Sequence, residues 1–184
     1  DNLKMVQNAK ELDELASSVS DCGGVYIVPA FSGLFAPHWR SDARGVIAGL
    51  TGYVNRAHIC RAVLEATAFQ ANDIFEAMEL DSGINLKTLK VDGGLTNSNP
   101  LMEFQSDILS IPVIRPRITE TTALGAAFAA GLSVDIWQNR ENLSKYWKEQ
   151  LRWTPSMDEK TRQNKIIFWR KAVSRTLNWA SKEE

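Results

Sequence analysis

The sequence contains few of the residues that bind metals or form disulfides. It has two cysteines and two histidines among 184 residues. Cys22 and Cys60 lie far apart, and neither has the closely spaced Cys or His residues that a metal site requires. We therefore expect two reduced thiols in a cytoplasmic protein, and no bound metal.

An excess of charge of one sign is also absent, because 21 basic residues are balanced by 22 acidic ones. This balance gives no sign of a nucleic-acid partner or of binding to an anionic membrane surface. The apolar uncharged run at residues 121–134 is too short to span a bilayer and is interrupted by glycines. We therefore expect no membrane span.

The N-terminus lacks the basic region, apolar segment and cleavage site of a signal peptide. It opens on Asp1 rather than Met, where the chain approaches its first expected helix, so we expect a piece of a longer polypeptide. The 184 residues are enough for one large domain, or a domain with an appendage, that buries a sizeable core.

Hydrophobic patterns predict an α/β domain whose helices pack against a largely buried sheet. Few strands are available for that sheet, so we expect it to be incomplete. Helical periodicity and β-branched or apolar runs place the elements as follows: helices at about residues 8–18, 56–78 and 100–109, and strands at residues 25–28, 45–50, 86–91 and 111–114.

The segment 121–131 consists almost entirely of small residues, with Gly125 and Ala129 on one helical face. Such a helix can make a tight crossing with another element, and such crossings can act as hinges. An ordinary buried helix explains the composition equally well.

The character of the chain changes after residue 134. We expect an αβ nucleotide-binding core at residues 1–134 and a helical extension packed on it at residues 135–184. The extension is rich in tryptophan and reads as amphipathic helices at residues 139–150 and 158–180. Its aromatic stripe could stack on single-stranded nucleic acid. Because the Trp spacing follows one helical face, we favour packing against the chain's own core.

Two single residues have both a structural and a functional interpretation. His38 lies in the long loop at residues 29–44, but no serine or cysteine motif accompanies it, so we favour a packing role over catalysis. Glu65 lies among apolar residues of the second helix. Because burying an unpaired carboxylate is costly, we expect Glu65 to have a partner.

The segment 89–99 is the strongest candidate for ligand binding. It reads as a short strand, an Asp92-Gly93-Gly94 turn and the polar start of a helix. Adjacent glycines allow a ligand to approach the backbone, and a helix N-terminus favours an anion such as phosphate. The same three residues also serve simply to turn a corner in many αβ proteins.

The spacing of several motifs resembles a known family. Gly45-x-Ile47-x-Gly49-Leu50, followed after seven residues by His58-Ile59-x-x-Ala62-Val63-Leu64-Glu65, is similar to the signature of the FGGY carbohydrate kinases. These proteins share a superfamily with actin, hexokinase and the heat-shock chaperone ATPases. The resemblance extends over nearly the whole chain through further segments at residues 28–34, 36–45, 91–96, 104–109, 122–127 and 169–173. Within the family, these segments are most similar to the branch that phosphorylates glycerol.

The resemblance implies an actin-like, ribonuclease H-like fold, of which this chain is most of the C-terminal lobe. It implies transfer of the γ-phosphate of MgATP to a terminal hydroxyl of glycerol, in a protein that forms homo-oligomers. The family's aspartate base and Gly-Thr-Gly phosphate loop are missing here, as are the metal ligands and most glycerol contacts. We therefore expect the catalytic residues upstream, and no activity from this chain alone.

The adenosine-binding turn is the part of the family's site that matches this sequence. The glycine that contacts the nucleotide falls on Gly94, with Gly93 beside it, and a family asparagine aligns with Ser98. The resemblance therefore implies ATP or ADP binding by Gly93, Gly94 and Ser98. Because serine has a shorter reach and one hydrogen-bonding group fewer than an amide, Asn97 or Asn99 could substitute for it.

Two alternatives stay open. The first is another sugar kinase of the family, acting on a pentulose, gluconate or rhamnulose. The second is a non-catalytic actin-like lobe used for assembly or regulation.

Overall fold

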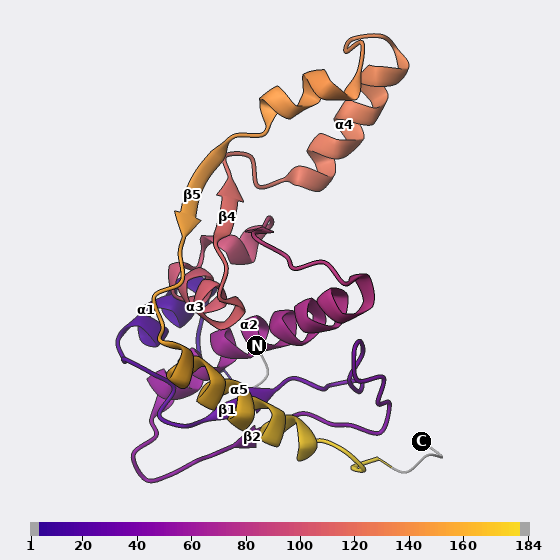
Figure 1. Ribbon diagram of the computed structural model, residues 1–184. Coiled ribbons are helices and arrows are strands. Elements are labelled where there is room, and N and C mark those ends of the chain that lie inside the picture. Colours follow the sequence, from indigo (N-terminus) through magenta and orange to yellow (C-terminus); the bar gives the residue numbers. More distant parts are fainter. Residues whose placement is uncertain (1–3, 181–184) are drawn as a thin grey trace.

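The computed structural model describes residues 4–180, without the side chains of Arg140 and Asn142. It shows a helical body with two small sheets, from which one arm projects (Figure 1). The α-helices of the described part are α1 (Ala9–Ser17), α2 (Arg56–Ser82), α3 (Asn99–Leu109), α4 (Thr121–Ser133) and α5 (Glu159–Ser174). The other elements are the strands β1 (Tyr26–Val28), β2 (Val46–Ala48), β3 (Leu89–Lys90), β4 (Val113–Pro116) and β5 (Glu149–Trp153), and the 3-10 helices η1 (Gly94–Asn97) and η2 (Arg140–Tyr146).

The strands form two separate sheets rather than one largely buried sheet. β1 and β2 pair in antiparallel fashion, with Ile27 opposite Ile47. In the second sheet the order is β3-β4-β5, where β3 runs parallel to β4 and β5 antiparallel to it. The expected α/β class is confirmed, with small sheets flanked by helices.

The long helix α2 is fixed at both ends by local interactions. The Asn55 side chain accepts hydrogen bonds from the backbone N–H groups of Ala57 and His58, and His58 Nδ1 accepts one from the Asn55 N–H. This reciprocal cap satisfies N–H groups that have no partner within the helix. At the other end Gly83 has a φ of 68°, the left-handed conformation that commonly ends a helix. His58 is thus a structural residue.

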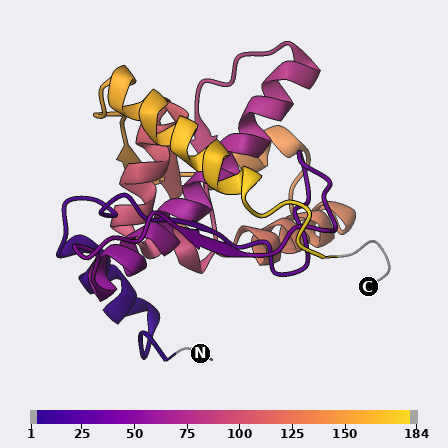
Figure 2. The same cartoon turned by 90° about the horizontal axis from the view of Figure 1, so that it is seen from below.

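Helices α2, α3 and α5 contribute most of the aromatic centre of the core. The Phe69 ring is stacked on Trp169 at 5.1 Å between centroids and meets Phe104 edge-on at 5.4 Å. Figure 2 shows α5 lying across β1 and β2, which it contacts. Trp169, Ile166 and Val173 of α5 are all buried, so the predicted packing of the last helix against the chain's own body is confirmed.

The first helix predicted in the extension, at residues 139–150, is wrong beyond residue 146. That segment contains η2, and β5 then pairs with β4, placing Arg152 opposite Ile114. Burial of Trp153 and the cation–π contact of Arg115 with its ring at 5.5 Å hold the strand in place. Because β5 completes a sheet that begins in the first 134 residues, the division into core and extension stays a prediction.

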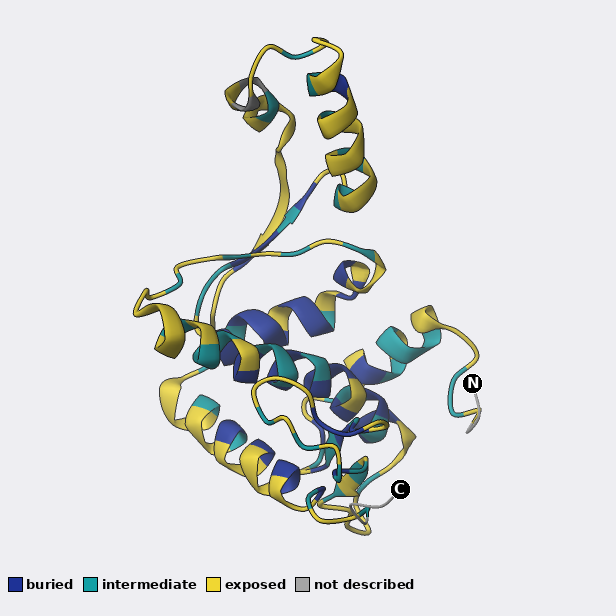
Figure 3. Cartoon of the chain, turned by 90° about the vertical axis from the view of Figure 1, so that its right-hand side faces the viewer, coloured by how far each residue is buried: buried dark blue, intermediate teal, exposed yellow. Residues whose placement is uncertain are grey.

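Helix α4 is neither buried nor part of a tight crossing, so both interpretations of its small residues are wrong for this chain. It projects from the body at the end of the β4–β5 ribbon (Figure 1), and Gly131 is its one buried residue. Figure 3 shows most of its surface as exposed. Phe128 of α4 packs against Trp137 and Tyr146, but most of the apolar surface of this helix has no partner among the described residues.

We expect the 184-residue chain to self-associate in solution. The exposed apolar surface of α4 and the large exposed side chains of Phe31 and Phe35 form patches that monomeric proteins usually cover. Light scattering coupled to size-exclusion chromatography measures the mass of the species present. A monodisperse, cooperatively unfolding monomer would contradict this expectation.

Candidate functional site

The candidate turn follows β3 and is connected to α3 by η1. Gly93 has a φ of 81°, which side-chain-bearing residues rarely adopt, so the fold itself requires glycine there. The Gly93 carbonyl accepts hydrogen bonds from the N–H of Thr96 at 3.2 Å and from its hydroxyl at 2.7 Å. The predicted sequence of strand, turn and helix is confirmed, with the 3-10 helix η1 as an addition.

The turn is also tied to the segment that leads into α4. The Thr121 hydroxyl donates a hydrogen bond to the Asp92 carboxylate, and the Gly93 N–H donates to the Thr119 carbonyl at 3.1 Å. Asp92 thus fixes the turn. Sequence reasoning missed Thr119 and Thr121, because no local pattern indicates a contact between residues so far apart in the chain.

At position 94, unlike at position 93, the fold does not require a glycine. Its backbone is outside the left-handed region, and a Cβ at this position would meet no other atom within 4 Å. The absence of a side chain therefore leaves free space and exposed backbone beside the turn. A flat ligand could approach both.

Ser98 is buried, and its hydroxyl is engaged within the chain. It donates to Asp13 Oδ1 of α1 at 2.7 Å and accepts from the Leu101 N–H at 3.4 Å as the N-cap of α3. The neighbouring Asn97 and Asn99 are exposed, and Asn97 Oδ1 accepts from Arg115 at 3.3 Å. The structure thus places Ser98 below the turn and both asparagines at its surface.

A cavity of about 390 Å³ lies beside the turn, between β3, α2 and α3. Its size falls in the range of sites for small molecules. Most of its lining is apolar, which suits a flat ring better than a charged group. Gly93, Gly94 and Ser98 adjoin this cavity without lining it. The lining includes Asp92 from the turn, Leu95 and Thr96 from η1, and Thr67, Ala71, Ile74, Phe75, Met78, Leu101, Met102 and Gln105 from the helices.

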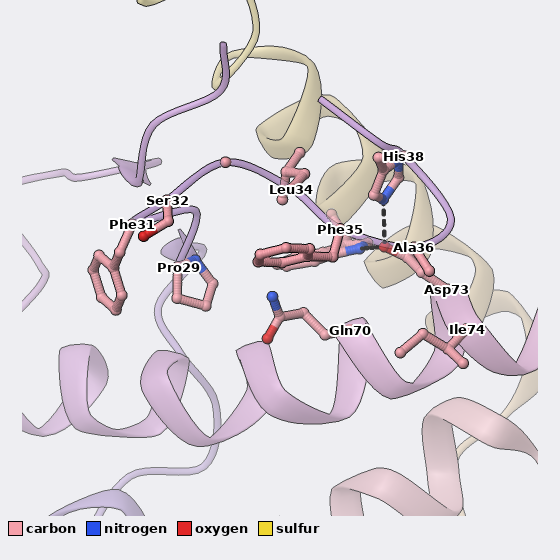
Figure 4. Close-up of a pocket in the computed structure, with 12 residues that line it drawn as sticks. Pro29, Phe31, Ser32, Leu34, Phe35, Ala36, His38, Gln70, Asp73 and Ile74 are labelled. Carbon is pink, nitrogen blue, oxygen red and sulfur yellow. Dashed lines mark hydrogen bonds and ion pairs between the residues drawn. The ribbon is translucent and has the colours of Figure 1, made fainter. Parts of the chain in front are cut away.

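His38 lines a different cavity, at the junction of its loop with α2 (Figure 4). His38 Nε2 lies 3.0 Å from Asp73 Oδ2, which also accepts a hydrogen bond from Trp169 Nε1 at 2.9 Å. Ser32 also lines this cavity, but in Figure 4 it lies at the opposite end from His38 and is not beside it. The arrangement supports the packing interpretation, because His38 fixes the loop on α2 and α5.

Within residues 4–180 no group of three or more His, Cys, Asp or Glu side chains could hold a metal ion. The phosphate-transfer chemistry of a kinase needs metal ions that neutralise the transferring group. The described residues provide a turn and, beside it, a cavity of small-molecule size. None of the helices in this part of the chain is long and apolar enough to cross a membrane.

The comparisons with known proteins all indicate the same family of kinases. Residues 2–134 match the family model described as the FGGY family of carbohydrate kinases, C-terminal domain. A glycerol kinase of Renibacterium salmoninarum is 57% identical over 183 residues, which are 100% of this chain and 36% of that protein. The chain thus spans about a third of the length of such relatives.

Solved structures show the same relation. The crystal structure of Plasmodium falciparum glycerol kinase with ADP matches 96% of this chain and 35% of that one, with 42% identity and a TM-score of 0.86. A ligand-bound xylulose kinase of Lactobacillus acidophilus, 18% identical, covers 94% of this chain and 34% of that one at a TM-score of 0.72, and shows a shared fold. The chain therefore belongs to the FGGY family of carbohydrate kinases and matches its C-terminal domain.

Proposed function

We propose that this chain is the adenosine-binding part of a glycerol kinase, which transfers the γ-phosphate of MgATP to a terminal hydroxyl of glycerol. The observation that carries the proposal is the 57% identity with the Renibacterium salmoninarum enzyme over the whole chain. The likeness to a glycerol kinase structure that contains ADP supports the use of a nucleotide.

In this proposal the turn holds the adenosine end of ATP. The bare backbone of Gly94 meets the nucleotide, and Gly93 gives the turn the φ of 81° that it needs. Ser98 contributes from below, where its bonds to Asp13 and Leu101 fix the start of α3. The exposed amides of Asn97 and Asn99 are then the side chains best placed to reach the nucleotide directly.

The rest of the protein supplies the other parts of the site. We infer that the magnesium ligands, the base that accepts the glycerol proton and most glycerol contacts lie in the part of the protein that this chain does not span, since the chain covers 36% of the length of the Renibacterium salmoninarum relative. Phosphoryl transfer depends on positioning by several loops at once, so this part has no turnover alone. The full-length enzyme works as a homo-oligomer in the cytoplasm, where Cys22 and Cys60 stay as the free thiols seen here.

A substrate panel tests the proposal. The full-length protein is expected to phosphorylate glycerol with a kcat/KM at least about tenfold above that for xylulose, gluconate or rhamnulose, because a fitted polar site rejects substrates of other shapes. A coupled assay of ADP release measures each rate. Preference for a sugar would move the protein to another branch of the family. Turnover of glycerol by the 184-residue chain alone would contradict the division of roles.

A further inference from the structure

The carboxylate of Glu65 is buried in the middle of α2, with one oxygen left without a hydrogen bond. Its side chain is 3% exposed. Oε1 accepts a hydrogen bond from Arg61 Nε at 2.9 Å, while Lys165 Nζ lies 3.7 Å from Oε2, beyond hydrogen-bond distance. Within the described part of the chain Oε2 is the one buried side-chain oxygen or nitrogen without a hydrogen-bond partner. A charged oxygen in this position is costly unless something donates to it.

Glu65 faces a cavity of about 490 Å³ between α2, α3, α5 and the α1–β1 turn. The cavity shares no lining residue with the one beside the Gly93–Gly94 turn. Lys165 and Arg61 lie over the Phe104 ring at 5.3 and 5.9 Å, so both cations are held in place. The remaining walls carry hydroxyl groups and apolar surface, from Ser20, Tyr26, Met157 and Thr161.

The charges around the cavity select against ionic ligands. An anion would meet the carboxylates of Asp21, Glu65 and Asp107, and an organic cation would meet Lys165 and Arg61. Asp107 is already engaged, because its Oδ1 accepts from the backbone N–H groups of Ser156 and Met157 at 2.6 and 3.0 Å. The groups that remain for a ligand are an acceptor on Glu65 and donors on Lys165 and Arg61.

Cys22 also lines this cavity but is a poor partner for Glu65. Burial, followed by the negative charge of Glu65, raises the pKa of the Cys22 thiol to about 11, so it stays protonated. A thiol is a weak hydrogen-bond donor, and it leaves most of the demand of Oε2 unmet. A hydroxyl group fits better, because it can donate to Oε2 and accept from an ammonium group at the same time.

We propose that this cavity is a second binding site, for a neutral polyol. Oε2 has almost no accessible surface, so binding requires the Lys165 side chain to move aside. One hydroxyl of the ligand then donates to Glu65 Oε2 and accepts from Lys165 Nζ, and neighbouring hydroxyls meet Ser20 and Thr161. The carbon chain of the ligand lies against Tyr26 and Phe104. The site is separate from the proposed nucleotide site, because none of its residues lines the cavity beside the turn.

Calorimetric titration of the full-length protein with sorbitol tests this site. Glu65→Gln keeps the shape of the side chain and can still accept from Arg61, but it removes the charge that strengthens the bond to a hydroxyl. We expect this change to weaken sorbitol binding at least about tenfold. Lys165→Met should weaken binding as well. Glu103→Gln, the same change at an exposed position of α3, should leave it unaltered.

The possible outcomes separate this site from the substrate site. Sorbitol binding that persists unchanged in Glu65→Gln and Lys165→Met would place the ligand elsewhere and overturn the proposal. Absence of millimolar binding to the parent protein would mean that water alone meets Glu65, and would overturn it too. Binding lost in both variants supports the site even when the protein turns out to phosphorylate a sugar instead of glycerol.

Discussion

In the full-length protein, Gly94→Leu is expected to raise the KM for ATP about thirtyfold and to leave the KM for glycerol within about twofold. The leucine side chain would fill the open space beside the turn, where the proposal places the adenosine. The thirtyfold increase in KM corresponds to a loss of about 2 kcal/mol in binding free energy, which we assign to the close contact between the backbone and the nucleotide. Initial rates at varied ATP and varied glycerol measure the two constants separately.

The fold should tolerate the substitution, which makes the result interpretable. A side chain at Gly94 meets no atom within 4 Å and needs no unusual φ. Gly52→Leu is the matched control, because Gly52 also has free space around it and lies outside the candidate site. This control should change neither constant. Equal increases in both constants for Gly94→Leu would count against direct contact with the nucleotide.

The largest expected effect on stability comes from Trp169→Ala. Trp169 is 1% exposed, stacks on Phe69 and donates its indole N–H to Asp73. The change creates a cavity and leaves the buried Asp73 with one donor fewer. We expect a loss of about 3 to 5 kcal/mol in the free energy of unfolding.

Urea unfolding followed by far-ultraviolet circular dichroism measures this loss, at concentrations low enough to avoid self-association. Trp179→Ala is the control, because Trp179 is 73% exposed. It should alter the free energy of unfolding by less than about 0.5 kcal/mol. A similar small effect for Trp169→Ala would show that the stacked pair is not central to the core.

The elements fixed by local chemistry were predictable from the sequence. Asn55 and Gly83 set the two ends of α2, and these residue types have known preferences at helix ends. The turn at Gly93 was predictable for the same reason. Resemblance to the family then favoured a ligand-binding interpretation of the turn over a merely structural one.

The remaining features depend on contacts between distant parts of the chain. β5 is a strand because β4 lies beside it, and residues 139–150 taken alone look helical. The partners of Glu65 include Lys165 of α5, which no pattern around Glu65 indicates. The bond from Ser98 to Asp13 likewise joins α3 to α1. Only the folded chain brings these pairs together.

The tie between the turn and the start of α4 changes how sequence variants of this protein should be interpreted. Asp92 and Gly93 are held by Thr121 and Thr119, which lie outside the segments that resemble the family and beyond the lining of the adjoining cavity. A mutational screen that ranks positions by their distance along the chain from the turn would classify changes at these threonines as remote and neutral. Because the two threonines hold the turn in place through hydrogen bonds, changes at these positions should be grouped with changes at the glycines of the turn.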